Sequence, residues 1–177
     1  MDIKICGKCN WRTRGGFCSY HGNETATIGT CLEFTKITQL PKSNVLNVSY
    51  EEVDRLCDLI VKQIEGSHRI FLDIVTVAYG GIIPSAILGY KLGINQIHII
   101  HKPIKTPFMF TPTMLFCDDC VDLGSTLNAV ISMANMRPAI ATLYYKPTST
   151  IIPNYYGDET LKWIQFPWEH INAGGRI

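Results

Sequence analysis

The segment at 114–127 constrains the fold more than any other part of this chain. It reads Met-Leu-Phe-Cys-Asp-Asp-Cys-Val-Asp-Leu-Gly-Ser-Thr-Leu, so an apolar run passes through acidic residues into a small loop. The apolar residues at 114–117 are typical of a buried strand in a parallel sheet. Apolar residues recur at helical spacing after the loop, namely Leu127, Val130, Ile131 and Ala134. A strand that turns directly into a helix predicts an α/β fold.

The order of residues within this segment also indicates a sugar-phosphate site. Ligands of parallel sheets bind just beyond the carboxyl ends of the strands, where we expect Asp118 and Asp119. The following loop offers backbone N–H groups, two hydroxyls and the positive end of a helix dipole, which together favour a phosphate. This loop consists of Leu123, Gly124, Ser125 and Thr126. For a single Asp-rich turn, the alternative is an ordinary capped helix after a core strand.

From about residue 45, apolar strands alternate with amphipathic helices. Ser49 and Glu52 have the spacing of a capping box, which predicts the start of a helix. The apolar face of that helix consists of Val53, Leu56, Cys57, Ile60 and Ile64. Strands are predicted at 69–78, 96–101, 113–117 and 138–144, and further helices at 83–92 and 125–135. This alternation predicts a mostly parallel central sheet with right-handed crossovers, flanked by helices.

Residues 1–36 have a different character, because they contain few large aliphatic residues and five glycines. A stretch so poor in apolar bulk needs a covalent or metal staple to fold. We therefore predict a small cysteine-rich module with a metal site formed by Cys6, Cys9, Cys18 and Cys31. Zinc favours such closed thiolate sites, and a 4Fe-4S cluster also takes four cysteines. His21 could replace one thiolate, and free or redox-linked thiols are the remaining alternative.

Cys117 and Cys120 also have the spacing of a metal-binding pair. We interpret them differently, because Cys117 closes the predicted strand and is expected to point into the core. Cys57, on the apolar face of the first predicted helix, is likewise expected to be a core residue.

Composition and charge favour a small-molecule partner. The 177 residues include 16 Lys and Arg against 15 Asp and Glu, without a basic cluster typical of nucleic-acid or membrane binding. No apolar run approaches the roughly 20 residues that span a bilayer, and the first residues lack the apolar stretch of a signal peptide. We therefore expect a soluble cytoplasmic protein that binds neither nucleic acid nor membranes.

The segment at 114–126 resembles the ribose-phosphate motif of the type I phosphoribosyltransferases. The shared pattern is four apolar residues, two acids, two spacers, Asp, a spacer, Gly, a spacer and Thr. This resemblance implies that the loop Leu123–Thr126 binds the phosphate of phosphoribosyl pyrophosphate. It also implies that Asp118 and Asp119 bind the ribose hydroxyls, that Asp119 helps to place Mg²⁺, and that Asp122 lies under the base. Leu123 stands where the family usually has Thr, but its backbone amide is retained.

A second loop, formed by Tyr79, Gly80 and Gly81, follows the first predicted strand. Glycines in such a turn let the backbone approach an anion closely, and Pro84 suits the first turn of the next helix. The run resembles Arg-Gly-Gly-Leu-Val-Pro of the xanthine-guanine phosphoribosyltransferases, where this loop binds pyrophosphate. Tyr79 replaces the Arg, and a phenol cannot neutralise pyrophosphate as a guanidinium can.

Two C-terminal segments resemble the base-binding part of the same enzymes. The resemblance implies that Lys146 donates a hydrogen bond to the 6-oxo group of a purine. It implies that Trp163 lies against the ring and that the backbone at Ile164 reads the substituent at position two. An aromatic plane stacks any base, whereas a cation and backbone acceptors distinguish oxo from amino groups. Considered singly, Trp163 could be a core aromatic and Lys146 a solvated strand end.

The segment at 102–112 is shorter than the mobile flap that the family usually has there. Its three prolines make it stiff, so we expect incomplete closure over the site, or a cover supplied by the cysteine module or a second subunit. Lys102 and Lys105 could restore the positive charge missing at Tyr79. By default, exposed loop lysines only increase solubility.

The whole pattern predicts an Mg²⁺-dependent purine phosphoribosyltransferase of purine salvage, with its catalytic domain at 45–177 and Asp122 as the general base. The substrates would be phosphoribosyl pyrophosphate and guanine, xanthine or hypoxanthine. A non-catalytic nucleotide-sensing protein on the same fold, or transfer to a different base, is the alternative. Family habit implies a homodimer or homotetramer.

Overall fold

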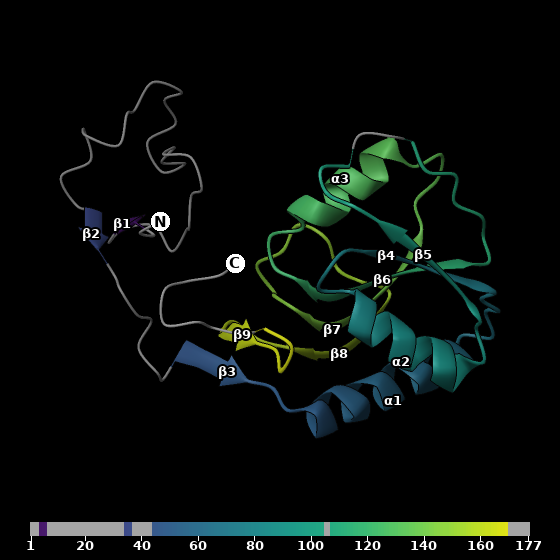
Figure 1. Cartoon of the computed structure of the whole chain (residues 1–177), viewed down its shortest axis with the longest axis horizontal. Helices are drawn as coiled ribbons and strands as arrows, with labels where there is room; N and C mark the ends of the chain where they lie inside the picture. The colour runs from purple at the N-terminus through teal and green to yellow at the C-terminus, as the bar shows by residue number, and fades with distance from the viewer. Residues whose placement is uncertain (1–3, 7–33, 37–43, 105–106, 170–177) are drawn as a thin grey trace. The chain divides into compact units, whose positions relative to one another are not determined.

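The computed structural model describes residues 4–6, 34–36, 44–104 and 107–169. The chain divides into two compact units, of which the larger is Asn47–Lys162 (Figure 1). Each unit is described by itself.

The smaller unit comprises Met1–Leu46 and Trp163–Ile177. Its described strands form two short sheets. In the first, β1 (Lys4–Cys6) pairs antiparallel with β2 (Phe34–Lys36). In the second, β3 (Val45–Asn47) pairs with β9 (Trp163–Gln165). The predicted metal ligands Cys9, Cys18 and Cys31, together with His21, lie outside the described residues, and only the backbone of Cys6 is described, so the cysteine module stays a prediction.

A five-stranded sheet forms the centre of the larger unit, with the strand order β5-β4-β6-β7-β8. All four neighbouring pairs are parallel. The strands are β4 (Asp73–Val77), β5 (Gln96–Ile100), β6 (Met114–Val121), β7 (Ala139–Tyr145) and β8 (Tyr155–Glu159). The predicted α/β architecture with a parallel central sheet is confirmed.

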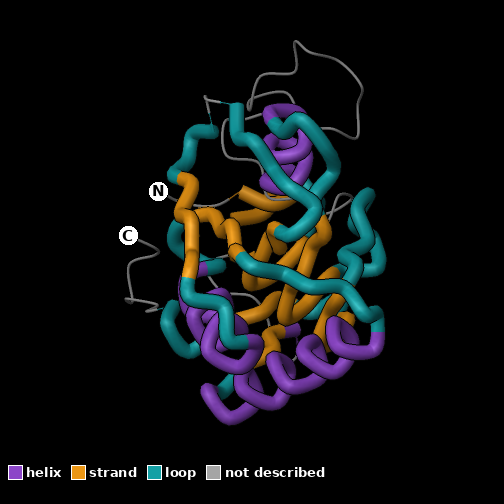
Figure 2. The backbone as a smooth tube through the Cα atoms, turned by 90° about the vertical axis from the view of Figure 1, so that its right-hand side faces the viewer, coloured by secondary structure: helices purple, strands orange, loops and turns teal. Residues whose placement is uncertain are grey.

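Helices cover both faces of this sheet. Two of them, α1 (Tyr50–Gly66) and α2 (Ile82–Leu92), lie on one face, and α3 (Ser125–Met133) lies on the other (Figures 1 and 2). Ser49 caps α1 by accepting the Glu52 N–H at 3.2 Å, and the apolar face predicted for this helix is buried. The Glu52 carboxylate binds Arg55 at 2.7 Å. No helix among the described residues is long and apolar enough to cross a membrane.

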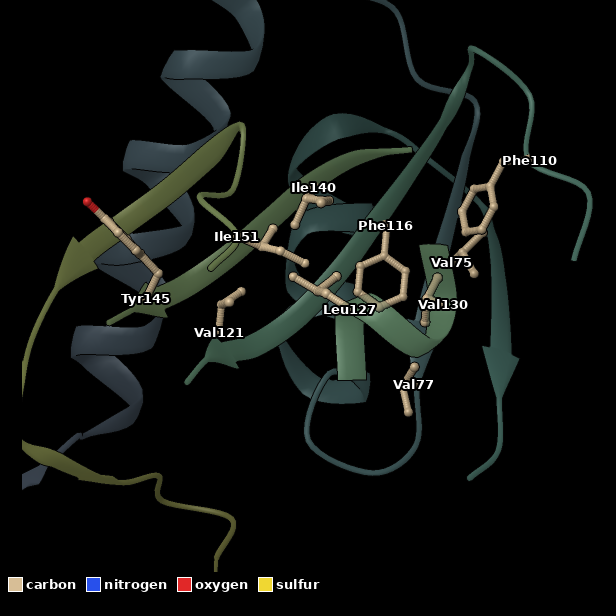
Figure 3. Close-up of a cluster of buried hydrophobic side chains, with 10 residues drawn as sticks. All are labelled: Val75, Val77, Phe110, Phe116, Val121, Leu127, Val130, Ile140, Tyr145 and Ile151. Carbon is tan, nitrogen blue, oxygen red and sulfur yellow. The ribbon is translucent and has the colours of Figure 1, made fainter. Parts of the chain in front are cut away.

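The core beneath α3 explains why the central strands are almost wholly apolar. Leu127 and Val130 of α3 pack against side chains of three neighbouring strands, among them Val75, Phe116 and Ile140 (Figure 3). Alternate residues of the same strands, such as Ile74 and Leu115, are fully buried as well. A strand covered on both faces cannot alternate apolar with polar residues.

Strand boundaries are where the sequence predictions were wrong. The strand expected at 69–78 begins at Asp73, because Ile70 and Leu72 are exposed and precede the parallel ladder. The strand expected to end at residue 117 continues to Val121, because β7 remains paired with it beyond the end of β4. β8 was not predicted, since its sequence Tyr-Tyr-Gly-Asp-Glu carries little apolar pattern.

Gly157 offers a test of how tightly α1 packs on β8. A Cβ at this position would lie 2.7 Å from the Cβ of Leu56 and 2.7 Å from the Leu143 carbonyl oxygen. Gly157→Ala is therefore expected to lower the free energy of unfolding by about 1–3 kcal/mol, measured by urea denaturation. Gly66→Ala is the control, because nothing lies within 4 Å of its added Cβ; it should be neutral or stabilise by up to about 1 kcal/mol. Equal effects of the two substitutions would contradict the packing described here.

Candidate functional site

The candidate site lies where the connections of the sheet change direction. From β4 the chain passes through α2 to β5, whereas from β6 it passes through α3 to β7 on the other side. α2 and α3 cover opposite faces, so the chain turns to opposite sides of the sheet after β4 and after β6. In open α/β sheets such a change of direction marks the place where ligands bind, in a crevice outside the carboxyl ends of the strands. Both loops that the sequence singled out begin at this point.

The paired acids lie within the last part of β6 rather than after it. β4 accompanies β6 only as far as Cys117, which pairs with Thr76, whereas Asp118 is paired with Thr142 of β7. One edge of β6 is therefore uncovered by β4 from Asp118 onward. The loop that follows β4 passes over this part of the strand.

Asp118 is held in an environment that opposes its ionisation. Its exposed fraction is only 8%, and burial, followed by the neighbouring Asp119 carboxylate, raises the pKa of Asp118 well above its usual value. The Asp119 N–H donates to Asp118 Oδ1 at 3.0 Å and partly offsets this effect. Asp119 is less buried, and its Oδ1 accepts the Cys120 N–H at 2.7 Å. A cation or hydroxyl donors arriving at this pair would favour the charged form of Asp118.

The two glycines after β4 touch the acid-bearing strand directly. A Cβ at Gly80 would lie 2.7 Å from Cγ of Asp119, and a Cβ at Gly81 would lie 2.8 Å from the Cys117 carbonyl oxygen. A side chain at Gly81 would meet the backbone of β6, and one at Gly80 would have to displace the Asp119 carboxylate, so the glycines permit this close approach. Tyr79, at the tip of the loop, is 83% exposed. The structure thus brings the predicted pyrophosphate loop and the predicted ribose acids together.

The loop after β6 prepares the start of α3. Gly124 has φ 81°, a left-handed conformation that favours glycine, and α3 begins at Ser125 without a side-chain cap. Leu123 is 38% exposed. The uncapped first turn of α3 leaves backbone donors at the end of the helix that attracts anions.

Sequence reasoning missed a hydroxyl-bearing turn that supports this loop. A Cβ at Gly124 would lie 3.3 Å from Ser149 Oγ and 3.2 Å from Thr150 Oγ1. Thr150 Oγ1 also donates to the Leu123 carbonyl at 3.4 Å. The available signal was the Thr-Ser-Thr run shortly after β7, the strand beside β6.

Asp122 and Lys146 form an ion pair at the ends of neighbouring strands. Lys146 Nζ lies 3.3 Å from Asp122 Oδ1, and the Lys146 N–H donates to the Val121 carbonyl at 2.9 Å. The predicted base-binding residues Trp163 and Ile164 lie on β9 in the smaller unit, so their part in the site stays a prediction.

Lys102, in the segment between β5 and β6, reaches the predicted phosphate loop. Lys102 Nζ donates to Thr126 Oγ1 at 2.9 Å. Lys105, the other lysine that could supply a positive charge, lies outside the described residues.

The cysteines of the larger unit that were assigned to the core are buried as predicted. Cys57 and Cys117 have no exposed surface, and burial raises the pKa of Cys57 to about 12. Burial also raises the pKa of Cys117, so neither thiol is a ready nucleophile. Within the part of the chain that the structure describes, no three His, Cys, Asp or Glu side chains lie close enough together to share one metal ion.

Comparison with known sequences finds phosphoribosyltransferases. This chain is 29% identical over 140 residues to a xanthine-guanine phosphoribosyltransferase of Gluconobacter oxydans, covering 69% of this chain and 83% of that protein. It is 30% identical over 111 residues to the xanthine-guanine phosphoribosyltransferase of Nitratidesulfovibrio vulgaris strain DP4, covering 54% of this chain and 68% of the relative. No family model matches the chain.

Solved structures agree with the sequence relatives. A purine phosphoribosyltransferase from Pyrococcus horikoshii superposes with a TM-score of 0.60 at 29% identity, covering 73% of this chain and 96% of that one. A xanthine-guanine-hypoxanthine phosphoribosyltransferase from Helicobacter pylori gives a TM-score of 0.62 at 23% identity, covering 70% and 92%. The second similarity concerns the fold alone.

The unfavourable ionisation of Asp118 predicts a pH-dependent gain of stability for Asp118→Asn. Folding raises the pKa of this carboxyl. At a pH below its ordinary pKa of 3.8 the group is protonated in the folded and the unfolded state alike, so it does not lower the free energy of unfolding. The loss of stability grows as the pH rises from 3.8 through the folded-state pKa, and it reaches its full size above that pKa. The variant should therefore unfold at higher urea concentration than the parent at about pH 7, with a gain that shrinks toward pH 3.8.

Asp158→Asn, at an exposed carboxylate of β8, is the matched control for this measurement. A pH-independent difference between Asp118→Asn and the parent would contradict the assigned cause.

Proposed function

This chain belongs to the family of the xanthine-guanine phosphoribosyltransferases, and from that membership we propose that it transfers a phosphoribosyl group to a 6-oxopurine. The donor is phosphoribosyl pyrophosphate, and the acceptor is guanine, xanthine or hypoxanthine. The products are the nucleoside 5′-monophosphate and pyrophosphate. The observation that carries this proposal is the contact of the Gly80-Gly81 loop with the Asp118-Asp119 strand. This contact joins a loop suited to pyrophosphate and acids suited to ribose in one crevice.

Each part of the crevice has a chemical task in this reaction. The backbone of Gly80 and Gly81 holds the departing pyrophosphate, and the loop Leu123–Thr126 holds the 5′-phosphate. Asp118 and Asp119 bind the ribose hydroxyls, and their negative charge stabilises the positive charge that develops at the anomeric carbon.

Mg²⁺ fits the donor set at Asp118 and Asp119. Proteins commonly bind this ion through one or two carboxylates and leave the remaining positions to substrate phosphates and water. Asp119 is the better ligand of the two, because its carboxylate is less buried and lies against Gly80, in the loop assigned to pyrophosphate. When bound, the ion would neutralise charge on the leaving pyrophosphate.

Asp122 and Lys146 are suited to the edge of a purine that carries O6 and N7. These two atoms are neighbours on one edge of the base, so groups 3.3 Å apart can address both. Lys146 donates to O6, and Asp122 faces N7. As N9 forms its bond to the anomeric carbon and the bond to pyrophosphate breaks, the proton on N7 passes to Asp122, a general-base role. Trp163 and Ile164 would complete the base site by stacking and by backbone recognition.

A non-catalytic nucleotide-binding protein is the second candidate. It is favoured by the exposed phenol of Tyr79 in place of an arginine and by the short segment between β5 and β6. The Asp122–Lys146 pair opposes it, because a protein that only binds nucleotides has little need for a base beneath the purine. Transfer to a different base keeps the chemistry and changes only the acceptor.

The cysteine module and the assembly complete the proposal. Cys6, Cys9, Cys18 and Cys31 hold Zn²⁺, with a 4Fe-4S cluster as the alternative. The active protein is a homodimer or homotetramer.

Incubation with labelled phosphoribosyl pyrophosphate, Mg²⁺ and a panel of purine and pyrimidine bases tests the function. We expect pyrophosphate release and nucleotide formation with at least one 6-oxopurine. Release with another class of base would support the different acceptor. Nucleotide binding without release for any base would support the non-catalytic candidate.

In the same assay, Asp122→Asn should lower turnover by about 10²–10⁴-fold, because the amide cannot accept the purine proton. Binding of phosphoribosyl pyrophosphate, measured by calorimetry, should change far less. Glu65→Gln, which removes an exposed carboxylate of α1, is the control and should retain full turnover. An equal loss of binding and turnover in Asp122→Asn would argue against the general-base role.

Metal analysis of the purified chain should find zinc in a colourless protein, and visible charge-transfer absorbance would instead indicate the iron-sulfur cluster. Cys31→Ser should lose the metal because it removes a thiolate ligand, whereas Cys120→Ser, outside the module, should retain it. A metal-free parent protein that is fully folded would refute the module.

A further inference from the structure

The segment between β5 and β6 is fixed along α3 by contacts near both of the helix's ends. Near its start, Lys102 Nζ donates to Thr126 Oγ1 in the first turn of α3 at 2.9 Å. Further on, the Phe108 N–H donates to the carbonyl of Met133, the last residue of α3, at 3.1 Å. Ile104 and Phe108 also pack against the hydrophobic core beneath the helix. Ile104 and Phe108, which follow Lys102 in the chain, are thus packed against the domain and keep Lys102 close to the phosphate loop.

A side-chain amide strengthens this attachment beyond the helix. Asn135 Oδ1 accepts the Phe110 N–H at 2.7 Å, and Asn135 Nδ2 donates to the Phe110 carbonyl at 3.1 Å. This paired contact holds the backbone of Phe110, whose ring is buried in the same core. The described parts of the segment are thus tied to the body of the domain.

The charge of Lys102 also acts on the acid pair. Burial and the Asp119 carboxylate raise the pKa of Asp118, and the ammonium of Lys102 opposes them. The ammonium of Lys102 is therefore within electrostatic range of Asp118, and the same ammonium donates a hydrogen bond to Thr126. Lys102 therefore acts electrostatically on Asp118, which the proposed function assigns to ribose, and hydrogen-bonds Thr126, which it assigns to phosphate.

The electrostatics of the crevice call for such a cation. The substrate is highly anionic, and the crevice already contains Asp118, Asp119 and Asp122. Lys146 is engaged with Asp122, and Tyr79 supplies no charge. An ammonium has three donors and Thr126 takes one, which leaves donors for phosphate oxygens. Lys102 is exposed, but its ammonium binds a hydroxyl at the start of a helix, whereas a lysine that only increases solubility would extend into water.

We propose that Lys102 is a phosphate-binding residue that donates to the sugar 5′-phosphate at the first turn of α3. The proposal rests on the proposed function for the identity of the phosphate. Lys102 lies outside both ligand loops, and its ammonium supplies the positive charge that Tyr79 does not. Charge-assisted hydrogen bonds of this kind change affinity by about 10- to 100-fold.

Calorimetry with ribose 5-phosphate and with pyrophosphate as separate probes tests this assignment in the full chain. Lys102→Gln should weaken ribose 5-phosphate binding by about tenfold or more and affect pyrophosphate far less. Lys102→Arg, which keeps the cation, should retain most of the affinity. Lys62→Gln removes an exposed lysine of α1, on the opposite face of the sheet, and should bind like the parent. Thermal unfolding checks that each variant is folded.

Steady-state kinetics supply the second readout. Lys102→Gln should raise KM for phosphoribosyl pyrophosphate by a similar factor and leave KM for the base unchanged, a division that general misfolding would not produce. Unchanged ribose 5-phosphate affinity, a loss confined to pyrophosphate, or no phosphate binding by the parent would each overturn the proposal. If no base supports turnover but ribose 5-phosphate binding still depends on Lys102, the proposed function fails and this assignment stands. Normal turnover that is insensitive to Lys102→Gln would overturn this assignment and leave the proposed function intact.

Discussion

The close approach of the Gly80-Gly81 backbone to β6 is the contact on which the rest of the site depends. At both glycines an added Cβ would meet β6, at the Asp119 carboxylate in one case and the Cys117 carbonyl in the other. The absence of two side chains therefore lets the loop after β4 close over the strand that carries the acids. The same contact lies at the point where the sheet connections turn to opposite sides, where ligands of open α/β sheets bind. A larger residue at Gly81 would push the loop away from the backbone of β6, and one at Gly80 would displace the Asp119 carboxylate.

Charge balance is the second constraint on this crevice. Asp118 is buried beside Asp119, an arrangement that costs free energy unless a cation or hydrogen-bond donors arrive. Lys146 offsets the charge of Asp122, and Lys102 moderates that of Asp118. The pKa of Asp118 stays raised in the free protein despite Lys102, and a ligand that brings hydroxyls and a divalent cation would favour its charged form. Such unfavourable arrangements persist in proteins chiefly at functional sites.

Particular elements show how far prediction from sequence could reach. The helix at α1 was predictable because its apolar spacing and Ser49 cap are local signals. The acids of β6 and the Gly80-Gly81 turn after β4 could each be recognised as candidate ligand groups, because each lies within its own strand-loop-helix unit and gives a local signal. β8 was not, because its pairing with β7 and the fit of Gly157 against Leu56 depend on tertiary neighbours rather than on its own pattern. The true end of β6 likewise depended on which partner strand continued beside it.

By itself, the sequence determined the fold class, the chemistry available at each loop and the burial of Cys57 and Cys117, since periodicity and residue type are properties of short segments. Tertiary structure alone decided which of these segments meet. It placed Gly80 on Asp119 and joined Lys102 to Thr126, which is 24 positions away in the chain. The physical reason is that the register of parallel strands and the direction of their crossovers bring loop ends together, and neither can be read from any single segment.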